Sequence, residues 1–182
     1  MRLSAGQRRE AALEAALELV VSEGIESLSV RNISQRAGMS VGSLRHVFPT
    51  QDALLADLLR FAQDRTVERI RPKIAALPKE PTAERAIDIL MEVLPLTSQS
   101  KAEALVQLAV LSLRPGNSEV DEARLRAHEG LDQLTANLPM LGDPLRLRLI
   151  LDGLMLRILE RPEIDEAQAR AILQAQCTQH SS

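Results

Sequence analysis

Polar side chains between Ser29 and Gln51 have the types and spacing of a surface that binds DNA. Serine, arginine, histidine and glutamine side chains donate hydrogen bonds to phosphate oxygens and to base edges in the major groove. The candidate contacts are Ser29, Arg31, Ser40, Val41, Gly42, Ser43, Arg45, His46 and Gln51. The chemistry that this pattern indicates is recognition of double-stranded DNA.

Two short helices joined by a tight turn must position these side chains. Ser29 has the type of a helix N-cap residue, and Val30, Ile33 and Ala37 fall three and four apart, which predicts one buried face. Gly38 is expected to end the first helix, because glycine adopts the left-handed backbone of a helix terminus at little cost.

The second helix is predicted to begin after Ser40, whose hydroxyl can accept from the free amides of the first turn. Leu44, Val47 and Phe48 form its buried face, so the other side chains of the helix point outward. Gly42 destabilises this short helix by about 1 kcal/mol relative to alanine. Close approach of another backbone would explain why glycine occurs at this position. The pattern is typical of a helix-turn-helix, whose second helix enters the major groove. An ordinary corner between two helices is the alternative.

Helices on both sides complete a three-helix headpiece. Upstream, residues 7–22 repeat apolar positions with helical period, Ser4 and Gln7 have capping-box spacing, and Gly24 closes the segment. Downstream, a long helix is expected from about Gln51.

At these residues the chain resembles the bacterial tetracycline-repressor (TetR/AcrR) family of transcriptional regulators. The resemblance lies in AALELVVSEGIESLSVRNISQRAGMSVGSLRHVFPTQDALL, which spans residues 15–55. It implies a helix-turn-helix domain at 1–50, with the start of the fourth helix, and a helical effector-binding and dimerisation domain at 51–176. Residues 177–182 are expected to form a disordered tail because of their terminal position.

Three residues depart from the usual pattern of that family. Arg45 stands where tyrosine is typical, so it can contact a phosphate or a guanine, and both contacts stay open. Val41 replaces a frequent lysine, and either core packing or contact with a thymine methyl would suit it. Gln51 also replaces lysine, which predicts a weaker dependence of DNA binding on salt.

Beyond about residue 70, prolines and polar turns divide the chain into helical pieces, and no alternating strand pattern occurs. Pro72 and residues 78–81 are predicted to separate the long fourth helix from a helix at 82–94. With the headpiece, these pieces predict an all-α fold of about nine helices.

The segment 145–159 carries too many apolar residues for one buried face, so we expect it to contact two partners. One is its own domain, and the other is the same helix of a second subunit. The expected interface residues are Leu147, Leu151, Gly153, Leu154 and Ile158. Burial of all of them within one chain is the alternative. The family resemblance also implies a homodimer, for which two-fold symmetry predicts an inverted-repeat operator with half-sites about 34 Å apart or more.

A small-molecule effector would lie among the helices of the second domain and would be apolar. Weak candidates for contacts with it are Met91, Leu94, Val106, Val110 and His128. Residues 93–113 and 149–173 also look loosely like the BetI-type subgroup. Choline is not expected, because an aromatic cage cannot form in a chain whose only aromatic residues are two phenylalanines.

Composition narrows the class of protein further. The net charge is −3, yet residues 1–50 hold six arginines against five glutamates, so only the headpiece leans basic. One cysteine and three histidines predict neither an internal disulfide nor a metal site, and no cofactor is expected. No apolar segment suits a membrane span or a secretion signal, which predicts a cytoplasmic protein.

These expectations favour a dimeric repressor that an unknown small molecule releases from operator DNA. A ligand-independent helical module that binds DNA or a partner is the alternative. An enzyme is not expected, because no nucleophile is paired with a base and no glycine-rich loop suits a phosphate.

Overall fold

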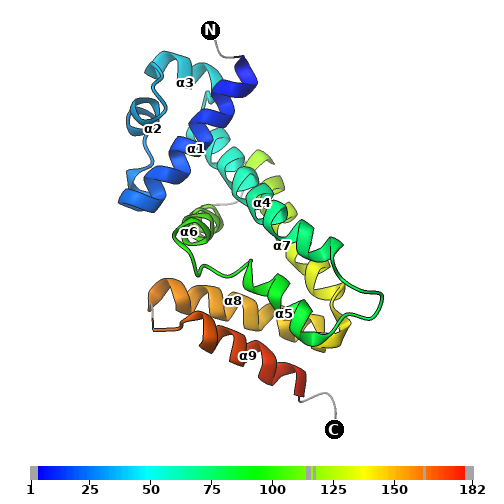
Figure 1. Cartoon of the computed structure of the whole chain (residues 1–182). Helices are drawn as coiled ribbons and strands as arrows, with labels where there is room; N and C mark the ends of the chain where they lie inside the picture. Colours follow the sequence, from blue (N-terminus) through cyan, green and yellow to red (C-terminus); the bar gives the residue numbers. More distant parts are fainter. Residues whose placement is uncertain (1–3, 114–115, 117, 162, 179–182) are drawn as a thin grey trace. The chain divides into compact units, whose positions relative to one another are not determined.

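The computed structural model describes residues 4–113, 116, 118–161 and 163–178. Within these ranges the chain forms helices and no strand, so the predicted all-α fold is confirmed there (Figure 1). The α-helices are α1 (Ala5–Glu23), α2 (Val30–Arg36), α3 (Val41–Val47), α4 (Gln51–Ala75), α5 (Ala83–Met91), α6 (Ser98–Ser112), α7 (Ser118–Ala136), α8 (Pro144–Glu160) and α9 (Glu166–Thr178). Short 3-10 turns span Ile25–Ser27 and Pro139–Leu141. None of the described helices is long and apolar enough to cross a membrane.

The helices belong to two compact units. Unit 1 consists of Met1–Gln63 and Ala102–Leu125, and unit 2 consists of Asp64–Lys101 and Arg126–Ser182. This division differs from the predicted boundary at residue 50, because α4, α6 and α7 each contribute residues to both units.

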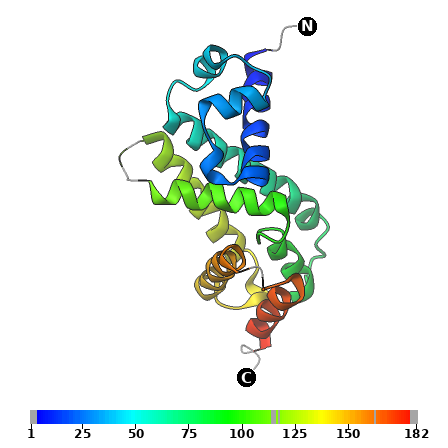
Figure 2. The same ribbon diagram turned by 90° about the vertical axis from the view of Figure 1, so that its left-hand side faces the viewer.

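The core of unit 1 extends from the headpiece into later parts of the chain. Ile33 of α2 and Leu44 of α3 are fully buried in the same apolar cluster as Leu58 of α4, Val106 of α6 and Ala123 of α7. Figure 2 shows α2 and α3 folded against α1, which they contact. Each fully buried aliphatic side chain contributes about 1.5–3 kcal/mol. The headpiece therefore depends on residues beyond 101 for part of its stability.

Helix termini in unit 1 follow the local sequence signals. Ser4 Oγ accepts from the Gln7 backbone N–H at 3.2 Å, and Gln7 Oε1 accepts from the Ser4 backbone N–H at 2.9 Å, which confirms the capping box. Gly24 ends α1 with a φ of 85°, in the region that glycine adopts without steric cost.

Arg9 of α1 contacts two other elements of unit 1. Its guanidinium pairs with the buried Asp57 carboxylate of α4 and lies 5.9 Å from the ring centroid of Phe48, the residue that ends α3. Arg60 also pairs with Asp57, with Nη1 3.1 Å from Oδ1. These contacts hold the end of α3 against α1 and α4.

The core of unit 2 is built from α5, α8, α9 and the turn before α8. Ile87 and Leu90 of α5 join Leu141 and Leu173 in one buried cluster that also contains the inward face of α8. Figure 1 shows α5, α8 and α9 close together, in agreement with their contacts.

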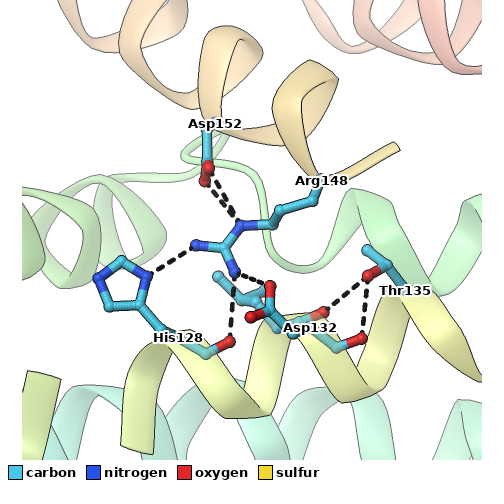
Figure 3. Close-up of polar contacts among 6 residues, drawn as sticks. His128, Asp132, Thr135, Arg148 and Asp152 are labelled. Carbon is cyan, nitrogen blue, oxygen red and sulfur yellow. Dashed lines mark hydrogen bonds and ion pairs between the residues drawn. The ribbon is translucent and has the colours of Figure 1, made fainter. Parts of the chain in front are cut away.

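A buried arginine joins α8 to α7 in unit 2 (Figure 3). Arg148 is only 8% exposed, and its Nε lies 3.1 Å from each carboxylate oxygen of Asp152. Its Nη1 donates to Asp132 Oδ1 at 2.7 Å and to the His128 carbonyl oxygen at 3.2 Å, and its Nη2 lies 3.2 Å from His128 Nδ1. The guanidinium thus compensates for its burial by contacts on two helices.

Three helix boundaries differ from the sequence prediction. Helix α4 continues through Pro72 to Ala75, because a proline this close to the end of a helix removes only one hydrogen bond before the helix stops. Helix α5 ends at Met91, three residues early. Helix α9 reaches Thr178, so Cys177 and Thr178 of the predicted tail have helical backbone, and residues 179–182 lie outside the described ranges.

Candidate nucleic-acid interface

The turn between α2 and α3 has the predicted geometry. Gly38 has a φ of 65°, and the Met39 backbone N–H donates to the Ser34 carbonyl oxygen at 2.8 Å. Ser29 Oγ and Ser40 Oγ each accept from the backbone N–H three residues on, both at 3.1 Å. These contacts confirm the two caps and the glycine turn.

Helix α3 has one buried face and one exposed face. Leu44 and Phe48 are buried in unit 1, whereas Arg45 and His46 are exposed and Ser43 is half-buried. The donors that could read a base or hold a phosphate therefore project away from the core.

The nine candidate DNA contacts come from the start of α2, from α3 with its cap, and from the start of α4. Eight of the nine are exposed, and Ser43 is the half-buried exception. The structure therefore leaves these side chains accessible to a partner.

Val41 is exposed rather than packed. Its side chain is 42% exposed, and it belongs to neither apolar core. The core-packing interpretation is therefore wrong, because the side chain at the first helical position of α3 is left open to solvent. Contact with a thymine methyl stays a prediction.

Within the part of the chain that the structure describes, no contact of Gly42 requires glycine. Its φ lies outside the left-handed region, and a Cβ built on it would meet only Ser40 Oγ, at 4.0 Å. Alanine would fit this position and would favour the helix. Close approach of another molecule would explain the glycine.

Four of the headpiece arginines fall into two groups. Arg36 pairs with Glu23 at 2.8 Å, and Arg9 pairs with Asp57, so both charges are compensated within the protein. Arg31 and Arg45 are exposed, and neither forms an ion pair within the part of the chain that the structure describes. Their charges are available to phosphate oxygens.

The sequence did not predict the contact between Arg9 and Asp57, which fixes the end of α3. The two residues are far apart in the chain, so no local spacing links them. The one available signal was the acidic Asp57 within the apolar run 54–59, every residue of which is buried. Such a carboxylate needs a cationic partner.

The candidate effector contacts do not come together in the structure. Met91 and Leu94 are buried in the core of unit 2, and Val106 and Val110 are buried in the core of unit 1. His128 is exposed and is bonded to Arg148. These five residues therefore form no common site within either unit, and the BetI-type resemblance stays an expectation.

Unit 2 also has a surface groove of about 320 Å³. It contains none of the candidate effector contacts. Its lining residues are Pro72, Lys73, Ala76, Leu77, Arg85 and Asp88. Of these, Lys73 and Asp88 are already paired with Glu92 and Arg170, at 2.8 and 2.7 Å.

The predicted dimer face of α8 points into the protein. Leu147, Leu151, Leu154 and Ile158 are all buried in the core of unit 2. Their assignment to a subunit interface is therefore wrong, since no second chain can reach them. Of the predicted interface only Gly153 is exposed.

The opposite face of α8 carries the apolar residues that remain uncovered. Leu145, Leu149 and Leu156 are exposed, with Leu149 at 63%, and Gly153 lies between the last two. Steps of four, four and three residues place these positions in one line along the helix. We call this line the α8 outer stripe.

Residues 12–58 match the model of the family described as bacterial regulatory proteins, tetR family. The match begins in α1, includes α2, the glycine turn and α3, and ends in the first half of α4. It thus covers the candidate nucleic-acid interface.

The chain is also similar to individual proteins. It is 32% identical over 127 residues to the HTH-type transcriptional regulator PksA of Bacillus subtilis (strain 168), a match that covers 69% of this chain and spans 58% of that relative's length. A transcriptional regulator from Rhodococcus sp. Rha1 has the same fold, with 24% identity, 94% of each chain covered and a TM-score of 0.78. The multidrug binding protein EbrR complexed with ethidium is 28% identical, with a TM-score of 0.70 over 93% of this chain and 98% of that one.

Proposed function

The chain belongs to the TetR family of bacterial regulatory proteins, and on that premise we propose that it is a dimeric transcriptional repressor whose α3 binds operator DNA. An effector that binds the helical region outside the headpiece would release it. DNA binding would place the protein in the cytoplasm, where bacterial DNA lies.

The observation that carries this proposal is the exposed face of α3. Val41, Gly42, Arg45 and His46 lie on a short helix that is anchored from behind by Leu44, and none of the four contributes to a core. A rigid helix with an accessible mixture of donors suits the major groove. The glycine suits a base edge or sugar-phosphate backbone at close range.

The uncompensated charges of Arg31 and Arg45 support a nucleic-acid partner over a neutral one. Arginine side chains release counterions when they bind phosphates, which supplies most of the non-specific affinity for DNA. Because the whole chain is acidic, binding is expected to depend on this local surface.

The α8 outer stripe supports a homodimer. Exposed leucines in a line can pack against the same line of a second copy, and Gly153 lets the two helices approach. A two-fold dimer would present two α3 helices to an inverted repeat with half-sites about 34 Å apart, or a multiple of that distance.

Release by a small molecule is supported by family membership and by the similarity to EbrR, which was crystallised with ethidium. The effector must prefer one arrangement of the two headpieces over the other to weaken operator binding. We expect the effector to be an apolar molecule, because the interior of each unit consists largely of aliphatic side chains.

A ligand-independent DNA-binding protein is the second candidate. The packing of Met91, Leu94, Val106 and Val110 into cores favours it, because no described cavity unites them. In that case unit 2 would serve dimerisation alone.

Footprinting on the region upstream of the gene tests DNA binding. We expect protection of an inverted repeat, and uniform weak binding to all sequences would contradict the proposal. Arg45→Ala should weaken binding by about 1–3 kcal/mol, whereas Arg36→Ala, which removes an internally paired arginine, should not. If Arg45 contacts a phosphate, its loss also lowers the slope of log affinity against log salt by about 1; if it contacts a base, specificity relaxes instead.

A thermal-shift screen with apolar metabolites and cationic dyes, ethidium included, separates the two candidates. A ligand that raises the melting temperature and abolishes the footprint supports the regulated repressor. A ligand that stabilises the chain and leaves the footprint unchanged contradicts release by that ligand.

A further inference from the structure

We propose that Val41 reads the 5-methyl group of a thymine in each operator half-site, an inference that rests on the proposed DNA-binding function. Val41 lies between Ser40 and Gly42 at the start of α3, among the candidate DNA contacts, and it is 42% exposed. Valine at this position is not stabilised by burial in a core, and as a β-branched residue it has only modest helix propensity. A contact with another molecule would explain why valine occurs here.

The chemistry of the major groove restricts what that contact can be. Guanine, cytosine and adenine present hydrogen-bonding groups there, whereas thymine alone adds a methyl group. The valine side chain has no donor or acceptor, so it would leave a polar base edge without a partner. The thymine methyl is the group that it can cover without this penalty.

The surface beside Val41 leaves room for the methyl group. Gly42 has no side chain, and the nearest atom to a Cβ at that position is Ser40 Oγ, at 4.0 Å. Ser40 Oγ is itself occupied as the acceptor for the Ser43 backbone N–H at 3.1 Å. Gly42 therefore adds no side chain that would keep a base pair away from Val41.

Deoxyuridine substitution tests the inference, because deoxyuridine is thymidine without the 5-methyl group. In the duplex found by footprinting, each thymine of a half-site is replaced in turn, and the dissociation constant is measured by fluorescence anisotropy at fixed salt. One position should lose about fourfold in affinity, the value for one buried methyl group. Replacement in both half-sites should lose about 15-fold.

Two valine variants identify the residue responsible. Val41→Ala should bind thymine and deoxyuridine duplexes equally at that position, since alanine lacks the two methyl groups that are proposed to cover the thymine methyl. Val67→Ala is the matched control, because Val67 is 43% exposed but lies in the part of α4 that belongs to unit 2. It should keep the full fourfold difference.

The outcomes separate this inference from the proposed function. If no thymine position responds to deoxyuridine, or if the response persists in Val41→Ala, thymine reading by Val41 is wrong while operator binding stands. If the chain protects no duplex sequence, the proposed function and this inference both fail.

Discussion

Gly42 shows at the scale of one residue how local stability and the proposed function oppose each other. Its backbone is helical and its surroundings are open, so the protein itself would accept a larger residue. Glycine within a helix loses more conformational entropy on folding than alanine does. The chain thus keeps a destabilising residue at the centre of the proposed reading surface, which is the pattern expected of a functional position.

Gly42→Ala is expected to raise the free energy of unfolding by about 0.5–1 kcal/mol and to weaken operator binding by about 1–3 kcal/mol. The added methyl group favours the helix but would meet the DNA. Urea unfolding and anisotropy titration measure the two effects.

The matched control is Gly130→Ala, since Gly130 lies in α7 and a Cβ there meets no atom within 4 Å. It should stabilise the chain by a similar amount and leave operator affinity unchanged. Unchanged operator affinity in Gly42→Ala would show that no partner approaches this glycine.

The arginines show what the sequence could not assign at this scale. The six headpiece arginines had the same composition signal for a positive surface, yet Arg9 and Arg36 serve internal ion pairs. Local spacing cannot reveal a partner on another helix. The caps Ser29 and Ser40 were predictable because each cap bonds only three residues along the chain.

At the scale of elements, α7 and α8 are joined through one buried guanidinium. Arg148 of α8 donates to Asp132 and to the His128 carbonyl oxygen, both on α7. Its Nε donates to Asp152, which lies on α8 itself. The carboxylates are partly exposed, so they remain hydrated if the arginine is lost. The main cost of losing it is therefore the loss of charge-assisted hydrogen bonds.

Arg148→Met should lower the free energy of unfolding by about 1–3 kcal/mol, because methionine keeps the apolar stem and removes every hydrogen bond. Arg126→Met is the control, since Arg126 and its partner Asp64 are both largely exposed, and its effect should stay within about 0.5 kcal/mol. Urea unfolding at one fixed chain concentration measures both. Equal effects of the two variants would mean that the buried network adds no stability.

Helix α8 also shows why periodicity can mislead. Apolar residues occupy both of its faces, so the pattern predicted two partners without indicating which face each would contact. The three leucines and one isoleucine assigned to a second subunit proved to be core. The faces are distinguished only by where α5 and α9 pack, which is information that a single helix does not contain.

At the scale of the whole molecule, the α8 outer stripe is the surface on which the proposed dimer depends. Leu149→Glu should convert the dimer into a folded monomer, because a buried unpaired charge is costly at a subunit interface. Analytical ultracentrifugation and circular dichroism measure the mass and the helix content. Operator affinity should fall as well, since two half-sites are no longer bound together.

Two variants define the specificity of that result. Leu125→Glu changes a leucine of α7 that is 58% exposed, and it should leave a dimer. Leu151→Glu changes a core residue, so it should unfold the chain rather than dissociate it. A Leu149→Glu protein that remains dimeric would exclude the stripe as the interface.

The fold class was predictable because helical periodicity and glycine or proline punctuation are local properties. The division into units was not, because it depends on contacts between segments far apart in the chain. Residues 102–125 were expected to belong entirely to the second domain, yet they complete the core of unit 1.

That shared core limits how the protein can be recombined. A hybrid regulator made by grafting residues 1–63 onto a foreign sensor would lose part of the apolar core of unit 1. The missing core residues would be Ala102, Val106, Val110, Val120 and Ala123. The apolar headpiece residues that pack against them would then be exposed to water or would pack poorly against the foreign domain. Successful transplantation of the DNA specificity should therefore require either that residues 102–125 travel with the headpiece, or that only the exposed positions of α3 are exchanged.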